Sequence, residues 1–332
     1  MGENILTVQN LKVYYHSANR IVPAVDGVDL TLAPGEMLGI VGESGCGKST
    51  AARALIGLYD KSYTQIAGGK ALFAGMDLLK LPVHALNRIR GKRISMIFQN
   101  PLTSLNPVYT IENQISEIIR LHEKLGRTAI HARCLELMKL VGIPAPEERL
   151  KDYPHQLSGG MQQRVLIAIA LACNPDIVIA DEPTTALDVT IQAQILNLIR
   201  DINRKMGMAM ILISHNMGII AEMCDRIMVM YGGVTVEEGD VVSLFRTPMH
   251  PYTRGLLMAI PSIEEEREAL FTIEGTVPRF SLPVTGCRFA ERCKQAMDIC
   301  RREAPQMISL ADGRNIRCHL YSNVINLRMQ PP

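Results

Sequence analysis

The sequence has no excess of charge of either sign. Its 332 residues include 35 lysines and arginines against 33 aspartates and glutamates, and charged residues make up 20% of the chain. Nucleic-acid-binding domains typically carry a strongly basic face or stripe. We therefore expect no nucleic-acid partner.

Long apolar runs are also missing. The longest, at residues 165–173, reads VLIAIALAC and is about half of what a bilayer-spanning helix needs. The start, MGENILTVQNLKV, has neither the basic nor the apolar region of a secretory signal. The expectations are that this chain does not cross a membrane and that it lies in the cytoplasm.

In that compartment the eight cysteines are not expected to form disulfides. Cys134, Cys173 and Cys224 fall within apolar helical patterns and are predicted to be core residues. The last four cysteines cluster near the C-terminus and need another explanation.

Hydrophobic periodicity predicts an α/β fold. Residues 5–13 and 25–32 alternate as two strands of an antiparallel edge sheet, and residues 111–141 show helical spacing typical of a helical insert. Strands are also predicted at 37–41, 177–180, 208–213, 226–230 and 234–238, and helices at 49–57, 161–172, 191–205 and 217–224. This alternation indicates a parallel sheet covered on both faces. After residue 247 prolines become frequent, which indicates a second, smaller domain.

A phosphate-binding loop is predicted between the strand at 37–41 and the following helix. Its sequence GESGCGKS fits the pattern G-x-x-x-x-G-K-[ST]. In such a loop, backbone N–H groups turn inward on a phosphate, the lysine reaches the β- and γ-phosphates, and the serine hydroxyl binds Mg²⁺. The predicted ATP-binding residues are Gly42, Glu43, Ser44, Gly45, Cys46, Gly47, Lys48, Ser49 and Thr50.

Two adjacent carboxylates, Asp181 and Glu182, follow the predicted buried strand at 177–180. At that edge of the sheet Asp181 would hold Mg²⁺ through water, and Glu182 would polarise the attacking water. Taken alone, the pair is better explained as a solvated turn before Pro183.

A second glycine pair at a helix start lies in the segment LSGGMQ, residues 157–162. It makes a second anion site in the same chain. Over residues 5–245 the order of these motifs closely resembles the ATP-binding-cassette (ABC) family, in which the LSGGQ-type signature of one subunit caps the γ-phosphate held by another. The one departure is Met161, where glutamine is commonest.

The resemblance implies roles for further residues. Tyr15 would stack on adenine, Gln99 would sense Mg²⁺ and the membrane partner, and His215 would contact the γ-phosphate. Catalysis would rest on Glu182, His215 and Lys48. The contacts made in trans to the nucleotide of the other subunit would come from Ser158, Gly159, Gly160 and Asp188.

Three segments resemble the peptide-importer branch of this family: QNPLTSLNP at 99–107, HPYT at 250–253, and ADGR followed by C-H at 311–319. The resemblance is to the dipeptide-transporter D-type subunit and implies an ATPase at the cytoplasmic face of the plasma membrane that drives di- or oligopeptide import. Nickel-chelate or glutathione import, or a soluble regulatory ATPase, remain alternatives.

The implied assembly contains a second ABC ATPase subunit, two permeases and, indirectly, an extracytoplasmic peptide-binding protein. Residues 1–246 would form the cassette, with a helical subdomain at about 105–165, and residues 247–332 the C-terminal domain. Residues 100–109, including Leu102 and Leu105, are expected to face the permeases.

The last four cysteines, Cys287, Cys293, Cys300 and Cys318, have the spacing C-x5-C-x6-C-x17-C. A metal staple is plausible in a short stretch with little apolar sequence. Structural zinc sites usually contain close C-x2-4-C pairs, which are missing here, so a cluster is favoured over Zn²⁺. The family resemblance also implies an iron–sulfur cluster, and we predict [4Fe–4S].

Overall fold

The computed structural model describes residues 4–17, 20–185, 187–260 and 272–322, except for the side chain at position 102. The chain forms two compact units. The first is built mainly from Lys80–Leu212 and also includes Leu32–Glu36, and the second combines Leu6–Thr31 and Met37–Leu79 with the residues from Ile213 onward.

The first unit contains three strands in the order β8-β7-β6, of which β8 begins in this unit. Strands β6 (Ile94–Ile97) and β7 (Ile177–Asp181) are parallel, with Ile94 opposite Ile177, and every residue of β7 is buried. Strand β8 spans Ala209–Ser214 and is buried throughout. Continuous apolar runs therefore form a strand covered on both faces, as predicted.

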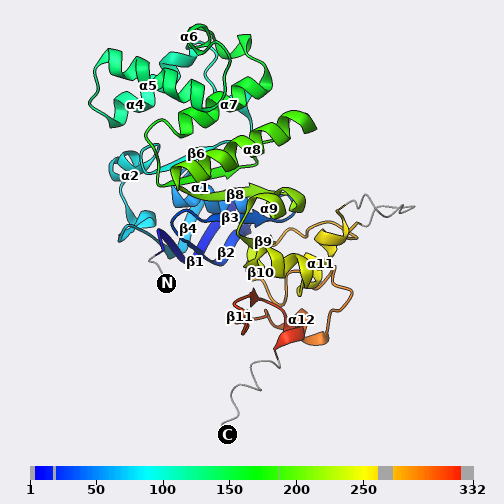
Figure 1. Cartoon of the computed structure of the whole chain (residues 1–332). Coiled ribbons are helices and arrows are strands. Elements are labelled where there is room, and N and C mark those ends of the chain that lie inside the picture. Colours follow the sequence, from blue (N-terminus) through cyan, green and yellow to red (C-terminus); the bar gives the residue numbers. More distant parts are fainter. Residues whose placement is uncertain (1–3, 18–19, 186, 261–271, 323–332) are drawn as a thin grey trace. The chain divides into compact units, whose positions relative to one another are not determined.

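Helices make up the rest of the first unit, and Figure 1 shows α4, α5, α6 and α7 gathered together. Their bounds are α2 (Val83–Ile89), α3 (Pro101–Ser104), α4 (Ile111–His122), α5 (Arg127–Leu140), α6 (Pro146–Arg149), α7 (Gly159–Ala170) and α8 (Val189–Met206), with a 3-10 turn at Pro154–Gln156. In α4 the fully buried residues Ile111, Ile115 and Ile119 form the apolar stripe of an amphipathic helix. The expected helical insert at 111–141 is present as α4 and α5.

The second unit has two sets of strands, ordered β2-β1-β4-β5 and β11-β12-β10-β9-β3. In the first set, β4 runs antiparallel to β1. In the second set, β9 is parallel to β3 and antiparallel to β10. The strands are β1 (Leu6–Ser17), β2 (Arg20–Leu32), β3 (Met37–Val41), β4 (Thr64–Phe73), β5 (Met76–Asp77), β9 (Arg226–Tyr231), β10 (Val234–Asp240), β11 (Ile308–Ser309) and β12 (Asn315–Ile316). The sequence did not predict β4, β5, β6, β11 or β12.

The helices of the second unit are short: α1 (Lys48–Leu55), α9 (Met217–Met223), α10 (Val241–Arg246), α11 (Pro251–Met258) and α12 (Asp298–Arg302), with 3-10 turns at Leu78–Lys80 and His319–Tyr321. The C-terminal region joins this unit through β12, which pairs with β10 at Ile316 and Glu237. The domain boundary at 246 and the helical-subdomain limits at about 105–165 stay predictions. In the part of the chain that the structure describes, no helix is both long enough and apolar enough to cross a bilayer.

Candidate nucleotide site

The phosphate loop connects β3 to α1 and requires glycine at two positions. Gly47, the residue before α1, has a φ of +102°, and a Cβ there would lie 2.2 Å from the carbonyl oxygen of Ala24. At Gly42 an added Cβ would lie 2.2 Å from the carbonyl oxygen of Met230. The loop can follow this path because neither residue has a side chain.

Lys48 is buried within the loop that it follows. Its Nζ donates to the carbonyl oxygens of Gly42, at 2.7 Å, and Glu43, at 3.0 Å, and lies 3.7 Å from the Cys46 sulfur. Burial raises the pKa of the Cys46 thiol, so this sulfur stays protonated beside the ammonium group. The loop thus places a cation at the start of α1, where the helix dipole adds positive potential.

Tyr15 lies beside the same helix. Its hydroxyl is 2.7 Å from the Thr50 hydroxyl, and its ring centroid is 5.9 Å from that of Tyr63. The structure therefore brings a predicted adenine-stacking residue to the phosphate loop. Tyr63 is half exposed and is a second aromatic face there that the sequence did not identify.

The first unit brings together Gln99 and Glu182. Asp181 ends β7 and is fully buried, and the next residue, Glu182, has a φ of +48°, which is unusual for a residue with a side chain. Gln99 Nε2 and the Thr185 hydroxyl both donate to Glu182 Oε2, at 2.8 and 2.9 Å. Thr185 was not predicted, and its position three residues after Glu182 would have been the signal for it.

The signature residues begin α7. Ser158 caps this helix, its hydroxyl accepting from the Met161 N–H at 3.4 Å, and Ser158 and Gly159 are exposed. Gly160 is close to α8, where a Cβ would lie 2.8 Å from Ile191 Cγ2. Asp188 caps α8 by accepting from the Ile191 N–H at 2.9 Å. The signature is thus an exposed helix start that is available to a ligand or a partner.

His215 directly follows β8 and is exposed. The next residue, Asn216, caps α9 by accepting from the N–H groups of Gly218 and Ile219, at 2.9 and 3.4 Å. The turn that carries His215 is therefore fixed on both sides by regular structure.

One expectation for the loop after Gln99 is wrong. Leu105 is only 3% exposed, so its side chain is part of the core and does not face a partner. Leu102 lies outside the described side chains. The exposed apolar residues of this loop are Val108 and Tyr109, which are 71% and 51% exposed. Two hydrogen bonds connect the same loop to α4: the Gln114 side-chain oxygen accepts from the Asn106 N–H at 2.9 Å, and Gln114 Nε2 donates to the Asn106 carbonyl at 3.0 Å.

The four C-terminal cysteines are free thiols, with Cys300 and Cys318 buried and Cys287 and Cys293 half-buried. The Cys287 N–H donates to the Cys300 carbonyl at 2.7 Å. Burial, followed by the charges of the other three thiols, raises the pKa of Cys318 to about 11. Across the described residues, however, no group of three or more His, Cys, Asp or Glu side chains is placed to hold a metal ion. The predicted metal centre is not observed.

Comparisons with known proteins agree with this geometry. Residues 25–185 match the family described as ABC transporter, and residues 236–300 match the family described as oligopeptide/dipeptide transporter, C-terminal region. The chain is 47% identical over 317 residues to the oligopeptide transport ATP-binding protein AppD of Bacillus subtilis (strain 168), which covers 96% of this chain and 97% of that protein. It is 46% identical over 318 residues to the dipeptide transport ATP-binding protein DppD of the same organism, covering 96% and 95%.

Among solved structures, the chain is similar to the post-hydrolysis dimer of the ATP-binding cassette MJ0796 bound to ADP and Pi. The TM-score is 0.64 at 28% identity, and the match covers 71% of this chain and 98% of that one. Fold and phosphate loop together define a P-loop ATPase cassette. The chain belongs to the ABC transporter family of ATP-binding proteins, and its activity is ATP hydrolysis.

Proposed function

We propose that this chain is the motor subunit of an importer, which couples ATP binding and hydrolysis to the uptake of di- or oligopeptides. The observation that carries the proposal is the match along 96% of the chain to proteins named for oligopeptide and dipeptide transport. The C-terminal match at residues 236–300 supports the same substrate class. Such a subunit would act at the cytoplasmic face of the plasma membrane, with two permeases and an external peptide-binding protein.

For hydrolysis we propose that residues 42–50 bind the phosphates of ATP, with Lys48 neutralising charge on the β- and γ-phosphates. Ser49 and Asp181 are oxygen donors of the kind that Mg²⁺ prefers, and the buried Asp181 carboxylate at the end of β7 fits that role. When bound, Mg²⁺ would neutralise charge on the phosphate oxygens. Tyr15 would stack on the adenine.

Glu182 would accept a proton from the attacking water. Its two donors, Gln99 and Thr185, hold one carboxylate oxygen at 2.8 and 2.9 Å, so the other oxygen is oriented by the same contacts. His215 would contact the γ-phosphate.

A second cassette would complete the site. The exposed Ser158 and Gly159 at the start of α7, together with Gly160 and Asp188, would contact the nucleotide bound by the other subunit. The MJ0796 cassette is described as dimeric with ADP and Pi bound, which supports a dimer here. We propose a heterodimer with a related ATPase, and a homodimer of this chain is the alternative outcome.

The substrate class is tested by ATPase stimulation in the assembled complex. Binding protein loaded with dipeptide or oligopeptide should stimulate hydrolysis, whereas nickel chelates or glutathione should not. Stimulation by a nickel chelate or glutathione alone would assign the motor to that solute instead.

We predict that Val108→Asp uncouples hydrolysis from transport. Val108 is exposed in the loop after Gln99, so the substitution leaves the core intact and places a charge on the surface proposed to meet the permeases. Basal ATPase activity should persist, and stimulation by loaded binding protein should be lost. Val83→Asp, at another exposed valine, is the control that keeps stimulation. Equal stimulation of the Val108 variant and the control would contradict this docking surface.

Leu105→Asp should behave differently, because it buries a carboxylate in the core. We predict a loss of about 3 kcal/mol or more in the free energy of unfolding, measured by chemical denaturation of the isolated chain. Unchanged stability would contradict the burial of Leu105.

We also propose that Cys287, Cys293, Cys300 and Cys318 hold a [4Fe–4S] cluster. The donor set fits chemically, because the other three thiols are near enough to contribute to the raised pKa of Cys318, and iron–sulfur clusters are held by four cysteines. When bound, the cluster would cross-link a region with little apolar sequence, although among the described residues no group of three or more side chains is placed to hold a metal ion. No step of hydrolysis depends on this group.

Anaerobically purified protein should be brown and contain about four irons per chain. Cys293→Ser should lose the iron, whereas Cys134→Ser, at a buried core thiol, should keep it. Colourless protein with stoichiometric zinc would replace the cluster by Zn²⁺, and protein without either metal would contradict both.

A further inference from the structure

Glu43, the second residue of the phosphate loop, is held by the C-terminal region. Its N–H donates to the Tyr252 hydroxyl at 2.9 Å, and its carboxylate oxygens accept from Arg292 Nη1 at 3.1 and 2.9 Å. Its carbonyl oxygen accepts from Lys48 Nζ at 3.0 Å. Every polar group of Glu43 is therefore engaged, and three of these four hydrogen bonds come from two residues more than 200 positions away.

The Tyr252 hydroxyl is fixed by the start of α11. The buried Glu237 carboxylate accepts from the N–H groups of Met249 and His250, at 2.9 and 2.8 Å. His250 Nδ1 accepts from the Tyr252 N–H at 3.1 Å, which requires a neutral ring, and burial lowers the pKa of His250 to about 3. The His-Pro-Tyr motif thus holds Tyr252 in one position.

Aromatic packing completes the support. The ring of Tyr252 lies 4.7 Å from that of Tyr231 and 5.3 Å from that of Phe289, measured between centroids. Tyr252 is fully buried. Its hydroxyl therefore cannot move from the phosphate loop without disturbing this cluster.

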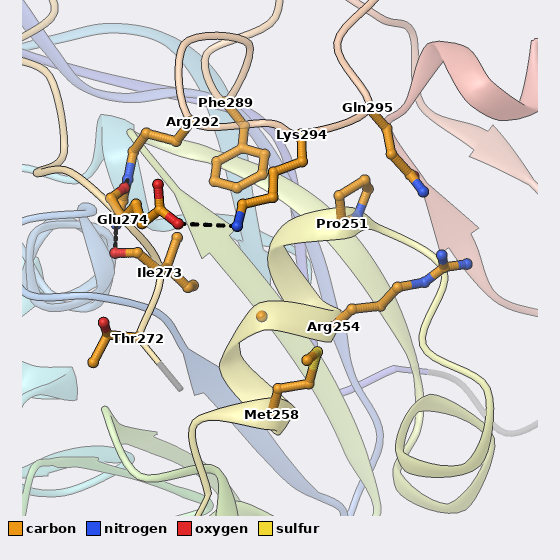
Figure 2. A pocket seen from close by; sticks show the side chains of 11 residues that line it. Pro251, Arg254, Met258, Thr272, Ile273, Glu274, Phe289, Arg292, Lys294 and Gln295 are labelled. Atoms are coloured by element: carbon orange, nitrogen blue, oxygen red, sulfur yellow. Dashed lines mark hydrogen bonds and ion pairs between the residues drawn. The ribbon is translucent and has the colours of Figure 1, made fainter. Parts of the chain in front are cut away.

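Arg292 is held equally firmly. Its guanidinium donates to the carbonyl oxygens of Ile273, Glu274 and Gly275, at 3.1, 2.9 and 3.1 Å, and its side chain is only 6% exposed. Arg292, Ile273 and Glu274 line a cavity of about 160 Å³. Figure 2 shows Arg292 beside Ile273 and Glu274, and Lys294 Nζ donates separately to the Glu274 carboxylate at 3.0 Å. Unlike Arg292, Lys294 is 72% exposed.

The negative charge of Glu43 affects the binding of nucleotide phosphates by the loop. A carboxylate in the loop that binds a polyanion repels it, and the repulsion is stronger where water is excluded. Arg292 cancels that charge, and Tyr252 fixes the backbone from which the loop turns. We propose that Tyr252 and Arg292, which we call the Glu43 clamp, position Glu43 and thereby set the affinity of the phosphate loop for nucleotide. Arg292 is a positioning residue, and the inference rests on the proposed role of residues 42–50 in binding ATP.

The test is the dissociation constant of the full chain for MgATP. Arg292→Ala should weaken binding by at least about tenfold, because it leaves the Glu43 carboxylate uncompensated beside the phosphates. Tyr252→Phe should weaken it by about threefold or more, because the Glu43 N–H loses its acceptor. Lys294→Ala removes a cation from the same loop without touching Glu43 and should leave the affinity unchanged.

The double variant Glu43→Gln/Arg292→Ala shows whether the weaker binding of Arg292→Ala comes from the uncompensated charge of Glu43 or from a defect in folding. It lacks the uncompensated carboxylate, so it should bind within about threefold of the wild type. Binding by Arg292→Ala equal to that of Lys294→Ala would overturn the inference, as would a double variant no better than Arg292→Ala. If Arg292→Ala does not fold, unchanged affinity in Tyr252→Phe overturns the clamp. Lys48→Ala serves as the reference, because unchanged affinity in that variant would refute the phosphate loop itself.

Discussion

Glu182→Gln is expected to abolish multiple-turnover ATP hydrolysis while ATP binding persists. The substitution keeps the shape of the side chain and an oxygen that can accept from Gln99 Nε2 and from Thr185, but it removes the group that would take a proton from water. Losing a general base typically costs a factor on the order of 10²–10⁴. The measurement is steady-state phosphate release by the assembled complex, with nucleotide binding measured in parallel.

The control for this variant is Glu147→Gln. Glu147 is 59% exposed and contacts only Lys139 among the described ion pairs, so the same chemical change there should leave turnover intact. Turnover near the wild-type rate in Glu182→Gln would contradict the assignment of the general base. A parallel loss of ATP binding would point to a structural defect at the end of β7 instead.

Lys48→Ala is expected to lose both nucleotide binding and hydrolysis. The Lys48 ammonium group is buried and donates to carbonyls of its own loop at 2.7 and 3.0 Å. An alanine leaves those carbonyls without their donor and removes the charge that would face the β- and γ-phosphates. Because charge-assisted hydrogen bonds contribute about 1.5–3 kcal/mol each, ATP affinity should fall by at least about tenfold.

Lys48→Arg is the informative companion. It retains the positive charge, but a planar guanidinium is not equivalent to a compact ammonium in a buried site. We expect Lys48→Arg to lose ATP binding and hydrolysis as well. This result would show that ATP binding needs the compact shape of the lysine ammonium group as well as its charge. Equilibrium binding of MgATP to the isolated chain checks both variants, and wild-type affinity in Lys48→Ala would contradict the proposed phosphate loop.

The elements that the sequence predicted are those whose pattern is local. The runs at 37–41 and 177–180 lack charged residues, and both lie in strands whose residues are all buried. The phosphate loop was predictable for the same reason, because its glycines are required by close backbone approaches that any such loop contains. The exposed signature at the start of α7 follows from its serine cap and glycine pair.

The strands that the sequence did not predict are defined by pairing with other strands. β4 is interrupted by Gly68 and Gly69, which obscure its alternation, and a Cβ at Gly69 would lie 2.6 Å from the carbonyl oxygen of Asn10 in β1. Gly69 is needed because the two backbones approach closely where their register shifts. β6 has only four residues, and its pairing with β7 defines it. Periodicity within one segment cannot show either effect.

Contacts between residues far apart in the sequence could not be predicted either. Tyr252 and Arg292 meet Glu43 across 209 and 249 positions, and only the His-Pro-Tyr motif marked one of them as unusual. Leu105 was placed on the surface as part of the segment 100–109 expected to face the permeases, whereas the structure buries it. An isolated leucine in a loop has no period from which its orientation can be inferred.

Uptake into proteoliposomes tests most directly whether ATP hydrolysis by this chain drives peptide import. The complex would contain this chain, its partner ATPase, two permeases and a labelled peptide on the binding protein. We predict that peptide accumulates only with MgATP and that Glu182→Gln in this chain abolishes accumulation. Accumulation at the wild-type rate with Glu182→Gln, or an active complex that takes up a different solute and no peptide, would contradict it.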